Sequence, residues 1–443
     1  MNKNHYGLHV DKRGNVTLSG RRYTGFGLNY FGAFAHYWHR PLDKALFKDA
    51  FAKIKTYGID YIRMPFCGGS ANYFSRWDSD PGGVYAHLDA VVAAAEELHL
   101  GIIAGLCWSC SAIPEHLGGH RSDYGDPESE TSVYSLRYIR EIVSRYADSP
   151  AVWGWEIGNE YNLEADLCDG RNWSWLPQYV KSPTGFDYMT SKEMLVFFSL
   201  AAGTIREIDP WRMISSGHGD MRPEAASLAA AAENVNEMTH IWSTRWEEQS
   251  RSDFERMNGY MSPEPIDALS FHLSHGTGDG SERYIESFER FGDILSQKEY
   301  LSAYAETAGR LGRTVFLGEM GDYRDLRGEA ETAGHFRDLC EDIRGAGIPL
   351  ACARLFQNFN ESEMNGSFMA ILGETNDDIK ASMKINIDKA WPRDKKKKAA
   401  ETLPAENKKK GSKAGAAAGL ILAAAAIGTT AIALMNGAGR RRR

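Results

Sequence analysis

Short apolar runs recur along most of the chain, and each ends in polar or aromatic residues. Eight of them occupy residues 23–30, 59–66, 101–108, 152–160, 212–218, 266–272, 314–319 and 351–358. Stretches with apolar residues at helical spacing separate several of them, at residues 42–57, 88–98, 132–146, 191–208 and 329–346. Continuous apolar runs are typical of strands that are buried on both faces. The pattern therefore predicts an α/β fold, a (β/α)8 TIM barrel, over residues 1–392.

Two longer segments interrupt this alternation. They are residues 162–190 after the fourth run and residues 219–265 after the fifth, and we expect both to lie over the carboxyl-terminal face of the barrel. A doubly wound sheet is the competing fold. No G-x-G-x-x-G follows the first run, so the sequence gives no support to a dinucleotide site.

The carboxyl-terminal ends of the strands carry the chemistry in barrels of this kind. The residues at those ends are Asn29, Arg63, Trp108, Asn159 with Glu160, His218, His272, Glu319 and Gln357. A carboxyl group at the end of an apolar run is costly to bury unless a partner or a function retains it. One such Glu is more often structural, but Glu160 and Glu319 end the fourth and seventh runs and would face one another. This pair favours catalysis.

Paired carboxylates suit the cleavage of glycosidic bonds. The reaction needs a proton donor for the leaving oxygen and a negative group beside an oxocarbenium-like centre. We expect Arg63 to keep Glu319 ionised by charge pairing, and we expect burial and the negative neighbour to raise the pKa of Glu160 so that it acts as the acid.

Four motifs at these positions resemble a known family. They are Tyr-Ile-Arg-Met-Pro at 61–65, Ile-Gly-Asn-Glu at 157–160, Leu-Ser-Phe-His at 269–272 and Gly-Glu-Met-Gly at 318–321. Over about residues 20–392 the chain resembles the retaining β-glycosidases of clan A, and most closely glycoside hydrolase family 5, the cellulase and β-mannanase family. The resemblance implies hydrolysis of β-linked glycans with retention of configuration.

The resemblance also implies a role for each matched residue. Glu319 would be the nucleophile, and Glu160 would protonate the leaving oxygen and then activate water. Asn159 would bond the sugar 2-hydroxyl, and Arg63 and His272 would support the two carboxylates. No cofactor is implied.

Other positions place the chain within the family. Trp155 and Glu156, before the acid/base motif, and Trp108, after the third strand, are similar to the β-mannanase branch, so we expect Trp108 to bind substrate. Two features depart from the family: Ser274 replaces an aromatic residue, and residues 354–359 lack the platform tryptophan. These departures indicate an atypical member. A catalytically inactive carbohydrate-binding barrel or adhesin, and a cell-envelope transglycosylase, are the alternatives.

Charge and composition narrow the partners. Residues 393–443 carry 13 Lys/Arg against 3 Asp/Glu, which leaves 38 against 56 in residues 1–392. An acidic body argues against nucleic acid as a partner, and an oligo- or polysaccharide remains the expected substrate. The six cysteines contain one C-x-x-C pair, at Cys107 and Cys110, without the second pair of a zinc ribbon. His116 and His120 lack the H-E-x-x-H pattern, so no metal site is expected.

The carboxyl-terminal end differs from the body. Residues 393–413 read as a basic disordered linker, residues 414–435 carry no charge and are long enough for a single transmembrane helix, and residues 436–443 form a basic tail. An Ala-rich tail that never inserts is the alternative. No apolar run follows the first lysine, so no secretory signal is expected. We therefore expect membrane attachment, and because both flanks are basic the side of the catalytic domain stays open.

Overall fold

The computed structural model describes residues 5–35, 38–166, 187, 189–232, 247–273, 287–321, 329–354, 366–384, 387 and 391. Residues 1–393 form one compact unit. The predicted linker, transmembrane segment 414–435 and basic tail lie outside the described residues. Among the helices that are described, none is both long and apolar enough to span a bilayer. The transmembrane helix therefore stays a prediction.

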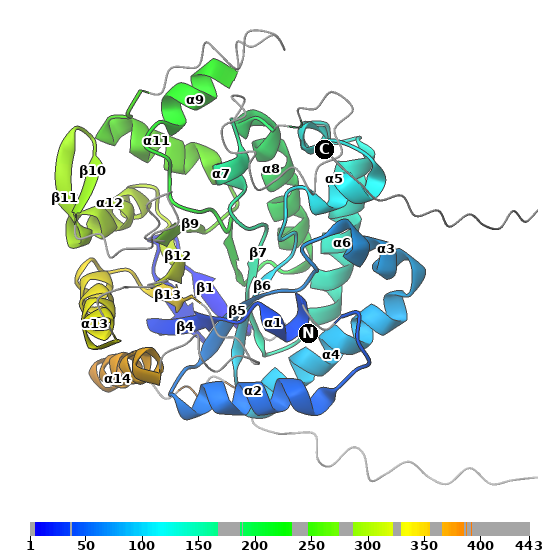
Figure 1. Ribbon diagram of the computed structural model, residues 1–443, viewed down its shortest axis with the longest axis horizontal. Helices are drawn as coiled ribbons and strands as arrows, with labels where there is room; N and C mark the ends of the chain where they lie inside the picture. The colour runs from blue at the N-terminus through cyan, green and yellow to red at the C-terminus, as the bar shows by residue number, and fades with distance from the viewer. Residues whose placement is uncertain are drawn as a thin grey trace, which may run out of the picture. The chain divides into compact units, whose positions relative to one another are not determined.

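Eight parallel strands close into a barrel, which confirms the predicted (β/α)8 fold (Figure 1). The strands are β4 (Gly25–Asn29), β5 (Tyr61–Pro65), β6 (Gly101–Gly105), β7 (Val152–Glu156), β8 (Met213–Ser215), β9 (Ala268–Leu273), β12 (Thr314–Met320) and β13 (Leu350–Ala353). Neighbours in sequence are neighbours in the barrel, and β13 closes it by pairing with β4. The described part of the eighth strand ends at Ala353, and Gln357 lies outside the described residues.

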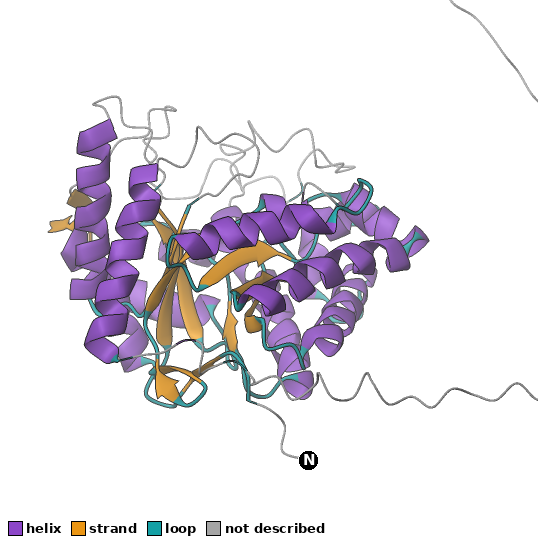
Figure 2. Ribbon diagram, turned by 90° about the horizontal axis from the view of Figure 1, so that it is seen from below, coloured by secondary structure: helices purple, strands orange, loops and turns teal. Residues whose placement is uncertain are grey.

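Helices surround the strands on all sides (Figures 1 and 2). The longer ones are α2 (Lys44–Thr56), α3 (Ala71–Ser79), α4 (Pro81–Leu98), α6 (Glu130–Tyr146), α8 (Ser191–Ile208), α11 (Arg251–Met261), α12 (Gln297–Arg310), α13 (Glu329–Gly345) and α14 (Gly366–Met383). In α2 the buried residues are Phe47, Ala50, Phe51 and Ile54, whose spacing forms one apolar stripe. The Asp43 side chain accepts from two backbone N–H groups at its start.

Several predicted helix bounds agree with the structure. The stretch 191–208 matches α8 at both ends, where Thr190 and Glu193 form a capping box. The stretch 88–98 underestimates α4, which begins at Pro81 because Asp80 caps it and proline suits the first helical turn. Trp77 is buried in α3.

Shorter elements cover the two ends of the barrel. At the amino-terminal end lies an antiparallel sheet of β1 (Leu8–Val10), β2 (Val16–Leu18) and β3 (Arg21–Arg22). The connections that follow the strands contain α1 (Gly32–Ala35), α5 (Ala112–Leu117), the 3-10 helix η1 (Arg121–Gly125), α7 (Tyr161–Glu164), α9 (Ala225–Ala232) and the hairpin of β10 (Ser287–Arg290) and β11 (Asp293–Ser296). The insertion 219–265 contains α9 and α11, and most of the insertion 162–190 lies outside the described residues.

Candidate active site

A buried arginine organises the carboxyl-terminal end of the barrel. Arg63 on β5 is fully buried. Its Nε donates to Glu156 at 2.7 Å, and its Nη1 donates to Glu319 at 2.9 Å and to Asn29 at 3.1 Å. Its Nη2 donates to Asn159 at 2.8 Å. A buried cation is tolerated when carboxylates and amides pair its donors, so this one residue joins side chains from β4, β7, β12 and the connection after β7.

Charge pairing and burial oppose one another at this arginine. Burial acts to lower the pKa of Arg63, but Glu156 and Glu319 outweigh it and the pKa is raised. At Glu156 the balance is reversed: burial raises the pKa more than the charges of Arg63 and His272 lower it. Ser215 on β8 donates to the second oxygen of Glu156 at 3.1 Å. Glu156 is thus a buried carboxylate held on both oxygens.

A bulge in β12 orients Glu319. The pairing of β12 with β9 shifts register between Leu317 and Glu319, so that Glu319 lies opposite His272. Bulges re-aim a side chain by adding one residue to a strand. A Cβ at Gly318 would lie 2.6 Å from Nε2 of His272, so only glycine fits there. Asn29 fixes the same peptide by donating to the carbonyl of Gly318 at 2.8 Å.

Glu160 lies just beyond β7 in a left-handed backbone conformation, with φ at 57°. Its N–H donates to the carbonyl of Gly217 at 2.8 Å, which ties the connection after β7 to the connection after β8. A Cβ at Gly217 would lie 2.0 Å from the carbonyl oxygen of Gly158. Non-glycine residues with positive φ often lie at functional sites, because surrounding contacts must hold them there.

His272 links the two glutamates across the barrel mouth. Its Nδ1 lies 2.8 Å from Oε1 of Glu160 and 3.7 Å from Oε1 of Glu319. One carboxylate oxygen of Glu160 and one of Glu319 lie within 4.8 Å of each other. The Glu160 side chain is 37% exposed and that of Glu319 is 8% exposed. The two carboxylates therefore differ in environment, with Glu160 closer to solvent.

The predicted rise in the pKa of Glu160 is wrong for the unliganded chain. Burial, the largest single influence, acts to raise this pKa. The hydrogen bond and charge of His272, together with the charges of Arg63 and Arg354, outweigh burial and hold the pKa below its usual value. The sequence places these cations near the strand ends but does not give the 2.8 Å contact with His272 on which the direction depends.

Trp108 and Arg354 border the two carboxylates. The Trp108 ring is half-buried, lies 4.6 Å from the guanidinium carbon of Arg63 and meets Phe31 edge-on. Arg354, at the end of β13, places its Nε 3.4 Å from Oε2 of Glu319, and its side chain is 37% exposed. An aromatic face beside charged groups is typical of a sugar-binding surface.

Glu160, His272 and Glu319 form a group whose ligand atoms are close enough to share a metal ion, within the part of the chain that the structure describes. Two carboxylates and an imidazole could bind a divalent cation. However, the guanidinium of Arg63 lies 2.9 Å from Glu319, and its charge opposes a second cation at that carboxylate. The geometry therefore fits acid–base and nucleophilic chemistry better than metal binding.

The six residues that the sequence singled out for the site come together, and their assigned roles stay predictions. Three residues that contact these side chains were not among the six predicted site residues: Glu156, Asn29 and Arg354. Asn29 was among the residues at the strand ends. Glu156 lies inside an apolar run, and a charged residue there was the available signal of a functional position.

His218 is buried below the site, where its Nε2 contacts the Met261 carbonyl and burial lowers its pKa to about 4. Ser274 and the loop residues Trp173, Trp175, Trp242 and Trp246 lie outside the described residues.

Comparison with known families agrees with this geometry. The model of cellulase, glycosyl hydrolase family 5, matches residues 16–340. The chain belongs to this family. Sequence relatives include a probable mannan endo-1,4-beta-mannosidase C from Aspergillus terreus, 26% identical over 48% of this chain, and mannan endo-1,4-beta-mannosidase 3 from Oryza sativa subsp. japonica, 24% identical over 50%. The aligned parts span 62% and 53% of those relatives.

Solved structures share the same fold. The endo-1,4-beta-mannanase from Rhizomucor miehei aligns with a TM-score of 0.57 and 14% identity over 85% of this chain and 99% of its own. At this identity the structural similarity supports the barrel fold alone. The assignment of this chain to family 5 rests on the matched family model and on the sequence motifs.

Proposed function

We propose that this family 5 chain is a glycoside hydrolase that cleaves β-linked mannan with retention of configuration. The observation that carries the proposal is the separation of the two glutamates, whose nearest carboxylate oxygens lie within 4.8 Å. Retaining enzymes place their carboxyl groups about 5 to 5.5 Å apart, whereas inverting enzymes need about 6.5 to 9.5 Å to admit a water molecule. An oxygen–oxygen separation of at most 4.8 Å favours the first arrangement.

In the proposed mechanism Glu319 attacks the anomeric carbon while Glu160 protonates the leaving oxygen. A covalent glycosyl-enzyme forms, and water then attacks the same carbon after losing its proton to Glu160, which restores the free carboxylate of Glu319. The nucleophile is held in orientation because Arg63 and Arg354 each contact one of its oxygens. Asn159, which accepts from Arg63, would bond the sugar 2-hydroxyl.

The acid role of Glu160 requires a proton that the unliganded site disfavours there. Its carboxylate is 37% exposed and bonded to His272. A sugar in the mouth would remove that exposure, and the loss of water raises the pKa of a carboxyl group. Nδ1 of His272, at 2.8 Å, holds the Glu160 carboxyl in a fixed orientation as the substrate binds.

The choice of mannan rests on two supports. The curated relatives are named mannan endo-1,4-beta-mannosidases. In addition, the half-buried Trp108 lies over the guanidinium of Arg63 beside both carboxylates, where a sugar ring could stack. β-Glucan is the second substrate to test, because the matched family model is named for cellulases.

The experiment is hydrolysis of β-mannan, β-glucan and aryl β-glycosides by the full chain. We expect release of sugar from β-mannan, with Glu319→Ala and Glu160→Ala both losing nearly all activity. Azide should restore turnover in Glu319→Ala on an activated aryl glycoside and give a product of inverted configuration, because the small anion fills the space of the missing carboxylate. Glu207→Ala, at an exposed carboxylate on α8, is the matched control and should behave as wild type.

Three results would count against the proposal. Cleavage that survives Glu319→Ala would remove the nucleophile from its role. Binding of glycans without any cleavage would make the barrel a recognition module, and transfer of sugar to another glycan in place of water would make it a transglycosylase.

We propose separately that residues 414–435 anchor the chain to a membrane. The support is the uncharged length of 22 residues between basic flanks. The full chain should float with liposomes, and Ile427→Arg should release it, because a central arginine costs about 2.5 to 3.5 kcal/mol on insertion. Flotation that persists in Ile427→Arg would contradict insertion of this segment.

A further inference from the structure

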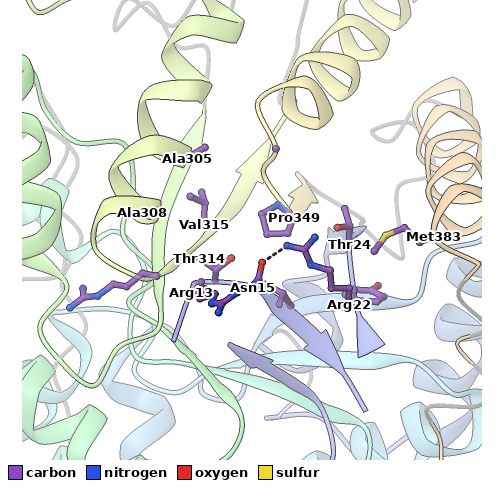
Figure 3. A pocket seen from close by; sticks show the side chains of 16 residues that line it. Arg13, Asn15, Arg22, Thr24, Ala305, Ala308, Thr314, Val315, Pro349 and Met383 are labelled. Carbon is purple, nitrogen blue, oxygen red and sulfur yellow. Dashed lines mark hydrogen bonds between the residues drawn. The ribbon is translucent and has the colours of Figure 1, made fainter. Parts of the chain in front are cut away.

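A cavity of about 320 Å³ lies at the end of the barrel opposite the glutamates (Figure 3). We call it the floor cavity. Its walls are the turn before β2, residues 22–24, the end of α12, the first residues of β12, Pro349 before β13, and Met383 at the end of α14. Thr314 begins β12, and Glu319 lies near the other end of the same strand, so the cavity and the candidate active site are separate.

The charge of the floor cavity is opposite to that of the body. Three arginines line it, Arg13, Arg22 and Arg313, and no lining residue is acidic. The body as a whole carries 38 basic against 56 acidic residues. Asp11 is near in sequence, but its carboxylate accepts from the backbone of Arg13 and from Asn15, within its own turn. Arg313 pairs with the carboxylate of Glu264, so Arg13 and Arg22 are the lining arginines that can attract an anion.

Two buried polar atoms at the cavity lack a hydrogen-bond partner among the described residues. Thr314 is 3% exposed, and its Oγ1 is unpaired. Arg313 uses its terminal nitrogens for the Ser262 carbonyl and for Glu264, but its Nε is unpaired. Buried polar groups are normally paired, and an unpaired one in a native structure calls for a ligand, an ion or water. A ligand hydroxyl or oxyanion in the cavity could bond to the Thr314 hydroxyl.

The arginines are held in place by the packing of the amino-terminal turn. Gly14 has φ at 76°, and a Cβ there would lie 2.1 Å from the carbonyl oxygen of Arg313, so the turn packs directly on the start of β12. The Arg22 guanidinium donates to the Asn15 side chain, and Figure 3 shows this pair beside Thr314. Within the described ranges the Arg13 guanidinium forms no hydrogen bond or ion pair, although its charge acts on Asp11, and both Arg13 and Arg22 are exposed.

We propose that the floor cavity binds a small phosphate-bearing molecule through Arg13, Arg22 and the hydroxyl of Thr314. Guanidinium groups present planar pairs of donors that match phosphate oxygens. The volume equals that of about ten water molecules, which is enough for a phosphate group with a sugar ring attached. A ligand there would connect the amino-terminal sheet to β12, and it would therefore stabilise the fold.

The test is calorimetric titration and thermal melting of the full chain with inorganic phosphate, a hexose monophosphate and the unphosphorylated hexose. We expect both phosphates to bind and to raise the Tm, and the free hexose to do neither. Arg13→Met and Arg22→Met should each weaken phosphate binding by about tenfold, as expected for one charged hydrogen-bonding group. Thr314→Val, which keeps the shape, should weaken it by about threefold.

Arg140→Met is the matched control, because this exposed arginine of α6 pairs with Glu207 far from the cavity lining. Phosphatidylcholine vesicles with and without phosphatidic acid distinguish the sources of the anion: capture that depends on Arg22 would assign the phosphate to a lipid headgroup. No binding of either soluble phosphate at millimolar concentration, together with vesicle capture that does not rise with phosphatidic acid, would overturn the proposal. Unchanged binding in the Arg13→Met/Arg22→Met double variant would also overturn it. None of these readouts needs glycan hydrolysis, so they stand apart from the proposed function.

Discussion

Two buried arginines at opposite ends of the barrel show how the same residue type serves different purposes. Arg63, at the mouth, donates to four side chains, two of which are carboxylates. Arg212, just before β8 at the floor, donates to the carbonyls of Val152, Ala147 and Ser149 and to the carboxylate of Asp209. Both are almost completely buried.

The partners explain the difference. Arg212 satisfies backbone carbonyls that would otherwise be unpaired, so its role is to close the fold. Arg63 pairs with groups that have no structural need to be there, because apolar side chains could fill the same space. Burying Glu156, Glu319 and Asn159 costs desolvation free energy. Polar groups buried at such a cost are typical of a functional site.

The largest expected effect comes from Arg63→Met. The variant removes the cation from Glu319 and frees Asn159, so we expect kcat/KM to fall by about a thousandfold, similar to the loss of a key electrostatic donor. The measurement is kinetics on the substrate that the wild type cleaves, with circular dichroism to show that the fold persists. Activity within tenfold of wild type would remove the distinction between the two arginines.

Arg212→Met tests the structural side of the comparison. It removes the donor to three carbonyls and the cation beside Asp209, so we expect a loss of about 3 kcal/mol in the free energy of unfolding. Asp209 has a pKa below its usual value, because Arg212 and Trp155 outweigh burial. Its contribution to stability is therefore present above the unfolded pKa and is lost as the pH falls through the folded pKa. Urea unfolding should show the loss, and kcat of the folded fraction should not change.

His272→Asn tests the link between the two glutamates. The wild-type pKa of Glu160 is lowered by His272 against the opposing effect of burial. Without the imidazole the pKa should rise, so the basic limb of kcat/KM, which reports the loss of the acid proton in the free enzyme, should move to higher pH. We expect kcat to fall about tenfold, because one charged hydrogen bond is lost. A profile that does not move would show that His272 is only structural.

Glu156→Gln is expected to have the smallest effect. Burial raises the pKa of Glu156, so its ionisation lowers stability as the pH rises through the folded pKa. Gln cannot ionise but can still accept from Arg63. We expect kcat within about tenfold of wild type and a smaller decline in Tm as the pH rises from the unfolded to the folded pKa of Glu156. A loss comparable to that of Arg63→Met would mean that Glu156 takes part in the reaction.

The barrel and the main site could be predicted because both follow from the order of strands. Each apolar run ends at the same face, so Arg63, Glu160, His272 and Glu319 meet in any closed barrel of these strands. The hydrogen-bond partner of Glu156 could not be predicted from the order of strands, because its bond to Arg63 depends on the register of β5 and β7.

Other features depend on contacts that no local pattern encodes. The direction of the Glu160 pKa depends on a 2.8 Å contact with His272, 112 residues away. The floor cavity depends on Gly14 packing against Arg313, and its separate walls give no common motif. Positions at strand ends are therefore predictable, whereas electrostatic balance and cavities require the packed structure.

The most direct test of the account is the anomeric configuration of the first product. Proton NMR during cleavage of a β-linked manno-oligosaccharide follows the new reducing end before it mutarotates. We predict that the β-anomer appears first, because the oxygens of Glu319 and Glu160 lie within 4.8 Å, which fits the spacing of retaining enzymes. Initial release of the α-anomer would contradict the assignment of Glu319 as a nucleophile.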